Sequence, residues 1–312
     1  MRMNINKRSS KARTTFKKNR AMLIMTMPAV IKTLIFSYLP MIGIILAFKD
    51  YNPRLGIFGS EWIGFKNFEF FFRSNAAIDI LRNTVVISAI NIITGMLINV
   101  VLALILYEVS KRIMLKFYQT VLFIPHFFSW VLVGLMLTAL LNQSSGFLTN
   151  ILLDLTGNKI NFYAKPVYWV AILPIINAWK GAGFGSLIYY SVLMSIDKEL
   201  FEAAEIDGAT KLQRIWNISV PHLKPMFMVL LIINMGSIIK TDFGLFYYVT
   251  RNSPQLYAWT DTIDTYVFRA LTQNNNFTMS SAVSLFQNAV GCVMLILTNK
   301  LAKRYDKDYA LF

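Results

Sequence analysis

The sequence predicts an all-α polytopic membrane protein with six transmembrane helices, and three observations lead to this fold class. Of the 312 residues, 55 % are hydrophobic and only 15 % are charged, whereas a soluble domain carries roughly 25 % charged residues. The mean hydropathy is +0.50, and apolar runs of about 20 residues or more, long enough to cross a bilayer, recur along the chain. Lys and Arg also gather in every second segment between those runs, as they do in membrane proteins.

The first segment, residues 1–20, holds eight Lys and Arg residues and no acid. The apolar run behind it is too long for a secretory signal peptide and lacks a small-residue cleavage site. A basic cytoplasmic tail beside anionic membrane lipids fits this composition. The net charge of +15 therefore reflects membrane topology, and we expect no nucleic-acid partner.

The apolar runs predict six spans with approximate limits. They are 22–48, 81–107, 120–141, 167–195, 226–243 and 279–299. Lys32 lies inside the first span, where it either reaches the cytoplasmic headgroups or faces a lumen. Asn83, Asn91 and Asn99 recur along the second span, where they either pack helices together or line a lumen.

The fourth and fifth spans carry further polar residues. Glycines in the fourth span suggest close helix packing or local unwinding, because no strand precedes them as a phosphate-binding loop requires. The fifth span is expected to run past Lys240 and Asp242, which would pair near its external end. Between the third and fourth spans we expect a short amphipathic segment, Phe147–Leu155, on the external side.

The distribution of basic residues orients these spans. Nineteen of the 31 Lys and Arg residues fall in segments 1–20, 108–119, 196–224 and 300–312, and eight fall in the longer loops on the other side. The positive-inside rule therefore places both termini in the cytoplasm. Segment 300–312 becomes a cytoplasmic tail, and the polar segment 196–224 also lies in the cytoplasm.

That polar segment contains the stretch FEAAEIDGATKLQRIWNISVPHLKP, residues 201–225. It predicts a helix whose acids, Glu202 and Glu205, lie in the first turn, where the helix dipole favours them. Gly208 suits the left-handed conformation that ends a helix. A second helix is expected over residues 211–219 and is expected to stop at Pro221.

The spacing Glu-Ala-Ala, three residues, Gly, nine residues, Ile, one residue, Val-Pro resembles the cytoplasmic loop of permease subunits in binding-protein-dependent ABC importers. Val220 stands where that pattern has Leu, and Asp207 and Ala209 match the sugar-importer version. The resemblance implies the type I ABC importer permease fold and a coupling helix that docks into an ATPase subunit. The residues that it assigns to coupling are Glu202, Ala203, Ala204, Asp207, Gly208, Ile218 and Pro221.

Two other segments, AFKDYNP…GIFGSEWIGFKNFEFFF and DFGLFYYVTRNSPQLYAWTDTIDTYVFRAL, resemble permeases of the polysaccharide and complex-oligosaccharide group. The resemblance implies uptake of oligosaccharides across the cell membrane. It implies a second homologous permease, two ATPase subunits that bind ATP and Mg, and an extracellular solute-binding protein or lipoprotein. The chain itself has no GxxxxGK[ST] loop and no catalytic or metal-binding constellation, so we expect a transport subunit without cofactor, and not an enzyme.

The sugar site of the maltose-importer group includes an Asn-x-Trp-Leu-Gly run. Counted from the Glu-Ala-Ala motif, that run resembles the segment here that begins at Asn177. The residues assigned to the substrate pathway are Asn177, Trp179, Lys180, Gly181, Phe184, Ser237 and Lys240. Lys180 replaces an apolar residue, and a cation inside a membrane is a functional candidate. It either favours anionic sugars such as uronates, or pairs with helix carbonyls or with an acid of the partner permease.

Two alternative functions remain at this point. An ABC permease for a non-sugar solute would share the loop but lack the Asp-Gly-Ala continuation and the two external segments. A secondary transporter or a membrane enzyme would show an inverted repeat or intramembrane His and acid clusters, and the sequence displays neither.

Overall fold

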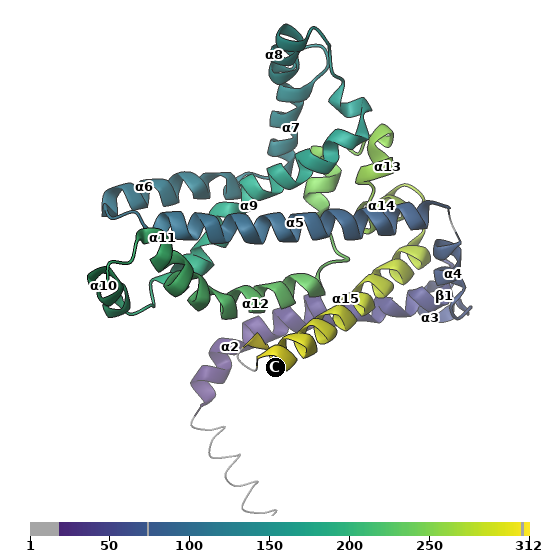
Figure 1. Cartoon of the computed structure of the whole chain (residues 1–312). Helices are drawn as coiled ribbons and strands as arrows, with labels where there is room; N and C mark the ends of the chain where they lie inside the picture. Colours follow the sequence, from purple (N-terminus) through teal and green to yellow (C-terminus); the bar gives the residue numbers. More distant parts are fainter. Residues whose placement is uncertain (1–18, 74, 307–308) are drawn as a thin grey trace, which may run out of the picture.

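The computed structural model describes residues 19–73, 75–306 and 309–312, and helices dominate it (Figure 1). The helices are α2 (Arg20–Thr33), α3 (Gly56–Gly59), α4 (Lys66–Phe72), α5 (Asn75–Tyr107), α6 (Arg112–Phe123), α7 (Trp130–Leu141), α8 (Phe147–Thr156), α9 (Trp169–Leu193), α10 (Lys198–Ile206), α11 (Lys211–Arg214), α12 (Val220–Gly236), α13 (Tyr257–Thr260), α14 (Ile263–Thr272) and α15 (Phe277–Tyr305). Two short antiparallel strands, β1 (Lys49–Asp50) and β2 (Glu61–Trp62), pair Lys49 with Trp62 and Asp50 with Glu61.

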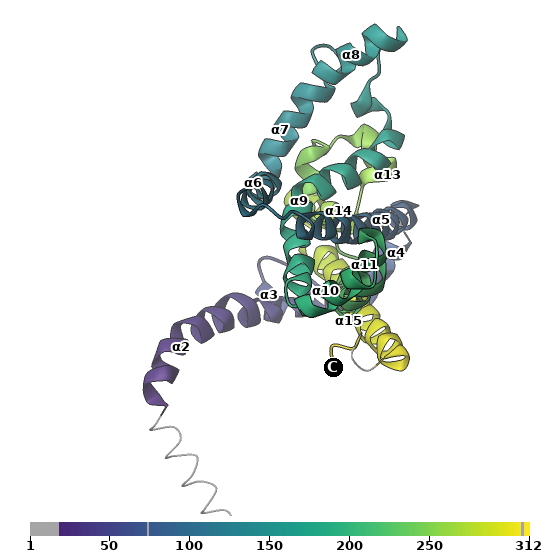
Figure 2. The same cartoon turned by 60° about the vertical axis from the view of Figure 1, so that its left-hand side comes forward.

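The described residues hold five helices that are long and apolar enough to cross a membrane, or six when one bent pair counts as a single span. The all-α fold with up to six spans is therefore confirmed. Helix α5 packs along α9, and α12 packs along α15. Figure 1 shows these four helices as the body of the molecule, with α10 at one end and α4 and β1 at the other. Figure 2 shows α2 extending away from that body, and none of its residues is buried.

The third span departs from the prediction of a span over 120–141. Helix α6 already begins at Arg112, and the chain bends by 95° between Arg112–Phe127 and α7. Pro125 lies in a tight turn over Ile124–Phe127 that ends in the extended residue Phe128. Ser129 then caps α7, since its Oγ accepts the N–H of Leu132 at 3.2 Å. The bend therefore separates α7 and α8 from the body (Figure 1).

The fifth span also differs from the prediction of 226–243. One helix runs from Lys211 to Gly236, so the second helix of the polar segment and the span are continuous. Pro221 does not end it, because a wider turn over Ile215–Ser219 precedes Pro221 and places it in the first turn of α12, where proline is tolerated.

The helix ends at Gly236 instead of continuing past Lys240 and Asp242. Contacts with α14 and with α15 hold the chain out of the helix here. The side chain of Asp264 accepts the N–H of Thr241 at 2.6 Å, and Gln287 donates to the carbonyl of Ile239 at 2.7 Å.

The second and sixth span helices extend beyond their predicted limits. Helix α5 begins at Asn75, ahead of residue 81, and α15 covers Phe277–Tyr305, so part of the predicted 300–312 tail is helical. Asn299, on α15, also holds the end of the chain, because it donates to the carbonyl of Phe312 at 2.8 Å and accepts from the N–H of Leu311 at 2.7 Å. The predicted limits of 279–299 for the sixth span are therefore too short.

The asparagines of the second span pack helices together. Buried Asn83 donates to the carbonyls of Ala258 at 3.1 Å and Asp261 at 3.3 Å, which ties α5 to α13 and the residue after it. Asn99 lies against Gly185 of α9, where an added Cβ would come within 2.2 Å of its amide nitrogen. The packing interpretation is confirmed for these two residues, since both contact neighbouring elements of the same chain.

Candidate functional sites

The polar segment forms a rigid helical hairpin at one end of the body. Asp197 begins α10 by accepting the N–H of Glu199 at 3.1 Å. Glu202 therefore lies in the second turn, and the prediction that Glu202 and Glu205 occupy the first turn is wrong. Sequence reasoning missed Asp197, although a residue of this type before an apolar-periodic stretch is a common helix start.

The turn after α10 closes as the sequence predicts. Gly208 has φ +79°, which L side chains adopt only with strain, and the N–H of Ala209 donates to the carbonyl of Ala204 at 2.9 Å. Thr210 and Gln213 then form a capping box that starts α11. An ion pair of 2.9 Å between Arg214 and Glu205 joins the two helices.

The motif residues divide between an anchored side and an exposed side. Ile218 and Phe201 pack against a buried cluster that includes Ala103, Tyr189 and Leu193. Pro221 is partly buried, and Ala204 is half-buried. The exposed members are Glu202, Ala203, Asp207 and Gly208.

Three large apolar side chains that the sequence analysis did not single out lie exposed on the same hairpin. Ile206 is 87 %, Leu212 65 % and Trp216 62 % exposed. The sequence does carry a signal for these residues. They are large and apolar but lie in a polar segment between spans, where they cannot be part of a membrane-spanning helix. Together with the exposed acids they form a surface that suits a protein partner.

The second candidate site surrounds the break between α6 and α7. The ammonium Nζ of Lys180, on α9, donates to the carbonyl of His126 at 3.0 Å and lies 4.9 Å from the ring centroid of Trp130. The indole nitrogen of Trp130 donates to a carboxylate oxygen of Asp242 at 2.8 Å. The Trp130 indole thus lies between the Lys180 ammonium and the Asp242 carboxylate and contacts both.

Further aromatic rings pack on one another at the break between α6 and α7 and on the facing part of α9. The ring of Phe184 stacks on the His126 ring with 5.0 Å between their centroids. The ring centroid of exposed Trp179 lies 6.2 Å from that of Phe128. Half-buried Asn177 and the exposed Gly181 share α9 with them. Sequence reasoning placed Trp179, Lys180 and Phe184 correctly on one segment but did not assign Trp130, Phe128 or Asp242, which only the bend brings close.

Gly183 and Gly181 of α9 have different surroundings. An added Cβ at Gly183 would lie 2.0 Å from the carbonyl oxygen of Leu122, whereas nothing lies within 4 Å of one at Gly181. Gly183 therefore permits α9 to approach the end of α6, and Gly181 faces open space beside Lys180.

Ser237 and Lys240 are exposed after the end of α12, and no contact described here brings them into the Lys180 cluster. The expected Lys240–Asp242 pair is absent from the ion pairs of the described residues. Asp242 instead accepts from Trp130 and, through its other oxygen, from the N–H of Gly244 at 2.9 Å. After the helix ends at Gly236, the Asp242 side chain thus contacts Trp130 and the backbone of Gly244.

The candidate spans, the exposed helical hairpin and the Lys180 cluster are features of a membrane transport subunit. Residues 91–307 match the family of inner membrane components of binding-protein-dependent transport systems. The chain belongs to this family. It is a permease subunit of an ABC importer, which is not itself an enzyme, and this excludes the secondary-transporter and membrane-enzyme alternatives.

Two curated relatives come from Bacillus subtilis (strain 168). The polygalacturonan/rhamnogalacturonan transport system permease protein YteP is 37 % identical over 290 residues, which cover 91 % of this chain and 88 % of YteP. Protein LplB is 32 % identical over 292 residues, 94 % of this chain and 91 % of LplB. The chain is similar to both over nearly its whole length.

A solved structure extends the similarity to the fold. The chain matches a crystal structure of a bacterial ABC transporter involved in import of the acidic polysaccharide alginate, with a TM-score of 0.86 and 32 % identity over 95 % of this chain and 99 % of that chain. The expected type I importer permease fold is therefore confirmed.

Proposed function

We propose that the chain is one of two homologous permease subunits of an importer for oligosaccharides that carry anionic groups. Two ATPase subunits would bind ATP and Mg and drive transport, and an extracellular solute-binding protein would deliver the substrate. Both termini would lie in the cytoplasm. The observation that carries the substrate class is the ammonium of Lys180, set among aromatic rings in the wall beside the helix break.

The environment of Lys180 supports an anionic ligand. One of its three N–H donors contacts the carbonyl of His126, and a second side of the group faces the Trp130 ring. A lysine ammonium has three donors and no acceptor, so donor capacity remains for a carboxylate. Trp179 and Phe184, both exposed, offer the flat apolar faces on which sugar rings stack.

The relatives support the same class. YteP is named for two polysaccharides, and the structural neighbour imports an acidic polysaccharide. A second structure of the alginate transporter is in complex with a pentasaccharide-bound periplasmic protein and matches with a TM-score of 0.85, which supports a solute-binding partner here.

A non-sugar anion is the second candidate. Permeases named for sn-glycerol-3-phosphate transport, UgpA of Escherichia coli strains, are 25 % identical over 226 residues, 72 % of this chain. Their lower identity and shorter match favour the oligosaccharide class.

The test is uptake in proteoliposomes of an acidic trisaccharide and its neutral methyl ester. Lys180→Leu is expected to lower acidic uptake about tenfold or more, the loss of one charge-assisted contact, while neutral uptake holds. Lys180→Arg should retain most acidic uptake, and exposed Lys66→Leu is the matched control. Equal loss of both substrates would make Lys180 a structural lysine, and no loss would remove it from the pathway.

The orientation of the chain has its own test. Cys292 is the single cysteine, so Asn150→Cys and Leu212→Cys can be labelled in a Cys292→Ser background. A membrane-impermeant thiol reagent should reach residue 150 from outside and residue 212 only from inside. Labelling of residue 212 from outside would overturn the proposed topology.

A further inference from the structure

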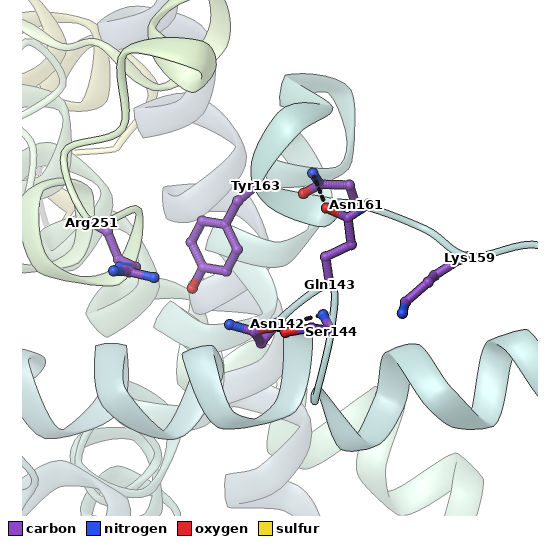
Figure 3. Close-up of a pocket in the computed structure, with 7 residues that line it drawn as sticks. All are labelled: Asn142, Gln143, Ser144, Lys159, Asn161, Tyr163 and Arg251. Carbon is purple, nitrogen blue, oxygen red and sulfur yellow. Dashed lines mark hydrogen bonds between the residues drawn. The ribbon is translucent and has the colours of Figure 1, made fainter.

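A pocket of about 370 Å³ lies beyond the end of α7, apart from the Lys180 cluster (Figure 3). It is formed where the loop after α7, the segment after α8 and the turn before α13 meet. Its lining residues are Asn142, Gln143, Ser144, Lys159, Asn161, Tyr163 and Arg251. The volume falls within the range of small-molecule sites, about 300–1,000 Å³.

The charge of the pocket is entirely positive. Lys159 and Arg251 line it, and no carboxylate does. The ion pairs of the described residues include neither cation. The guanidinium of Arg251 lies 5.9 Å from the ring centroid of Tyr163, so its neighbour is a neutral aromatic wall and not a counterion.

The backbone at Arg251 is strained. Arg251 (φ 58°) and Asn252 (φ 45°) are consecutive non-glycine residues in the left-handed region. Asn252 is fixed by its neighbours, since its side-chain oxygen accepts from Arg269 at 3.2 Å and from the hydroxyl of Tyr257 at 3.0 Å. Strained residues that their surroundings over-determine are concentrated at ligand sites.

The amides around the two cations present donors to the pocket. The side-chain oxygen of Asn142 accepts from the N–H and the hydroxyl of Ser144, at 2.9 and 2.8 Å. The side-chain oxygen of Gln143 accepts from Asn161 at 2.9 Å. Because both oxygens are engaged, the NH₂ groups of Asn142 and Gln143 remain for a ligand.

Tyr163 completes the site as a neutral wall. Burial raises the pKa of its hydroxyl, so the phenol stays protonated at neutral pH. Its ring, between Arg251 and Asn161 in Figure 3, offers an apolar face.

We propose that this pocket binds one uronate unit of an acidic oligosaccharide at the outer face of the membrane. Arg251 holds the carboxylate, and Lys159, on the other side of Tyr163 in Figure 3, adds positive charge at the far end of the pocket. The amides of Asn142 and Gln143 donate to the ring oxygens, and the sugar face rests on Tyr163. Arginine recognises carboxylates through paired hydrogen bonds. An acidic protein side chain would engage the cations but leave the amide donors and the aromatic wall unused. The external placement and the acidic substrate both rest on the proposed function.

The experiment measures binding to the assembled transporter in nanodiscs, in the absence of solute-binding protein. The probes are trigalacturonate and its trimethyl ester, a neutral molecule of the same length. Arg251→Gln removes the charge but keeps an unbranched polar side chain and the same backbone demand, and is expected to weaken trigalacturonate binding about tenfold or more. Lys159→Gln is expected to weaken it less, since a lysine contact is a single point charge.

Exposed Lys165→Gln is the matched control, because Lys165 lies in the same loop but does not line the pocket. The ester should bind weakly and equally to the wild type and all variants. Each titration is repeated in a Lys180→Leu background, in which pocket binding should persist.

Wild-type affinity of Arg251→Gln for trigalacturonate would overturn the proposal. Loss of all trigalacturonate binding in Lys180→Leu alone would place the ligand in the pathway and also overturn it, while leaving the proposed function intact. Weaker docking of the solute-binding protein to Arg251→Gln, with unchanged trigalacturonate affinity, would identify the pocket as a protein contact and overturn the sugar proposal.

Discussion

The turn at Gly208 and the break at Phe128–Ser129 both redirect a helix, but different forces hold them. At Gly208 every stabilising group lies within a few residues: a left-handed glycine, the bond from Ala209 to Ala204, and the Thr210 capping box. At the break, distant residues take part, because Lys180 donates to the carbonyl of His126 and Gly183 lies against the carbonyl of Leu122. Residues close in sequence are therefore enough to specify the turn at Gly208, whereas the break at Phe128–Ser129 needs the helices to be packed against one another.

The largest expected effect tests the local turn. Gly208→Val should abolish uptake and weaken association with the ATPase subunits, because a β-branched residue at φ +79° costs at least about 1–2 kcal/mol. Uptake by vesicles and co-purification of the ATPase measure the effect, and membrane insertion should be unchanged. Gly208→Asn is the control, since Asn tolerates left-handed backbone. Wild-type uptake by Gly208→Val would contradict the coupling role of the turn.

Glu202→Lys tests the side-chain charge of the same hairpin without changing its backbone conformation. Glu202 is exposed in the second turn of α10, so reversal of its charge leaves the fold intact. We expect loss of uptake together with weaker ATPase association. Normal thermal unfolding should accompany that loss, and a lowered unfolding temperature would show that Glu202 acts through the fold.

The next effect tests the distant contacts at the break. In Gly183→Ala the new Cβ meets a backbone oxygen at 2.0 Å, and overpacking of this kind costs about 1–3 kcal/mol. In Gly181→Ala nothing lies within 4 Å, and alanine is favoured over glycine in a helix by about 1 kcal/mol. Thermal unfolding in detergent should therefore shift in opposite directions. Equal shifts would mean that α6 and α9 are not packed closely at this point.

The same contrast explains which features the sequence predicts. Helix limits near Gly208 and the short amphipathic helix after Gly146 follow from caps and apolar spacing, and the structure confirms them. The bend in the third span was missed because Pro125 alone does not distinguish a kink from a break. The end of the fifth span was missed because it depends on Asp264 and Gln287, which are 23 and 48 residues away from the groups that they hold.

The candidate site around Lys180 also combines residues that are close in sequence with residues that are distant in sequence. Trp179, Lys180 and Phe184 share one helix, so a motif alignment finds them. Trp130 and Asp242 are 112 residues apart, and only the folded chain brings them beside the lysine. A search limited to one segment therefore recovers only the part of the cluster that lies on α9.

A smaller effect concerns the start of α7. Ser129→Ala removes the cap on the N–H of Leu132, a bond of 3.2 Å, and loss of such a cap costs about 1 kcal/mol. Hydrogen exchange should quicken in the first turn of α7 and remain unchanged in α10. Ser129→Asn should preserve the cap, and an equal acceleration in that variant would assign the effect to the tertiary contacts instead.

The smallest effect compares two ion pairs at the hairpin. The side chain of Arg214 is 17 % exposed and lies 2.9 Å from Glu205, whereas Lys211 is 75 % exposed and 3.9 Å from Glu108. Exposed pairs contribute about 0–1 kcal/mol, with the well-formed ones at the upper end. Arg214→Gln should therefore quicken hydrogen exchange along α10 at low salt, and Lys211→Gln should leave it unchanged. Because Glu205 is the only acid that Arg214 pairs with among the described ion pairs, Glu205→Gln should match Arg214→Gln, and the double variant should add nothing. Additive losses in the double variant would show that the two side chains stabilise the hairpin through separate neighbours.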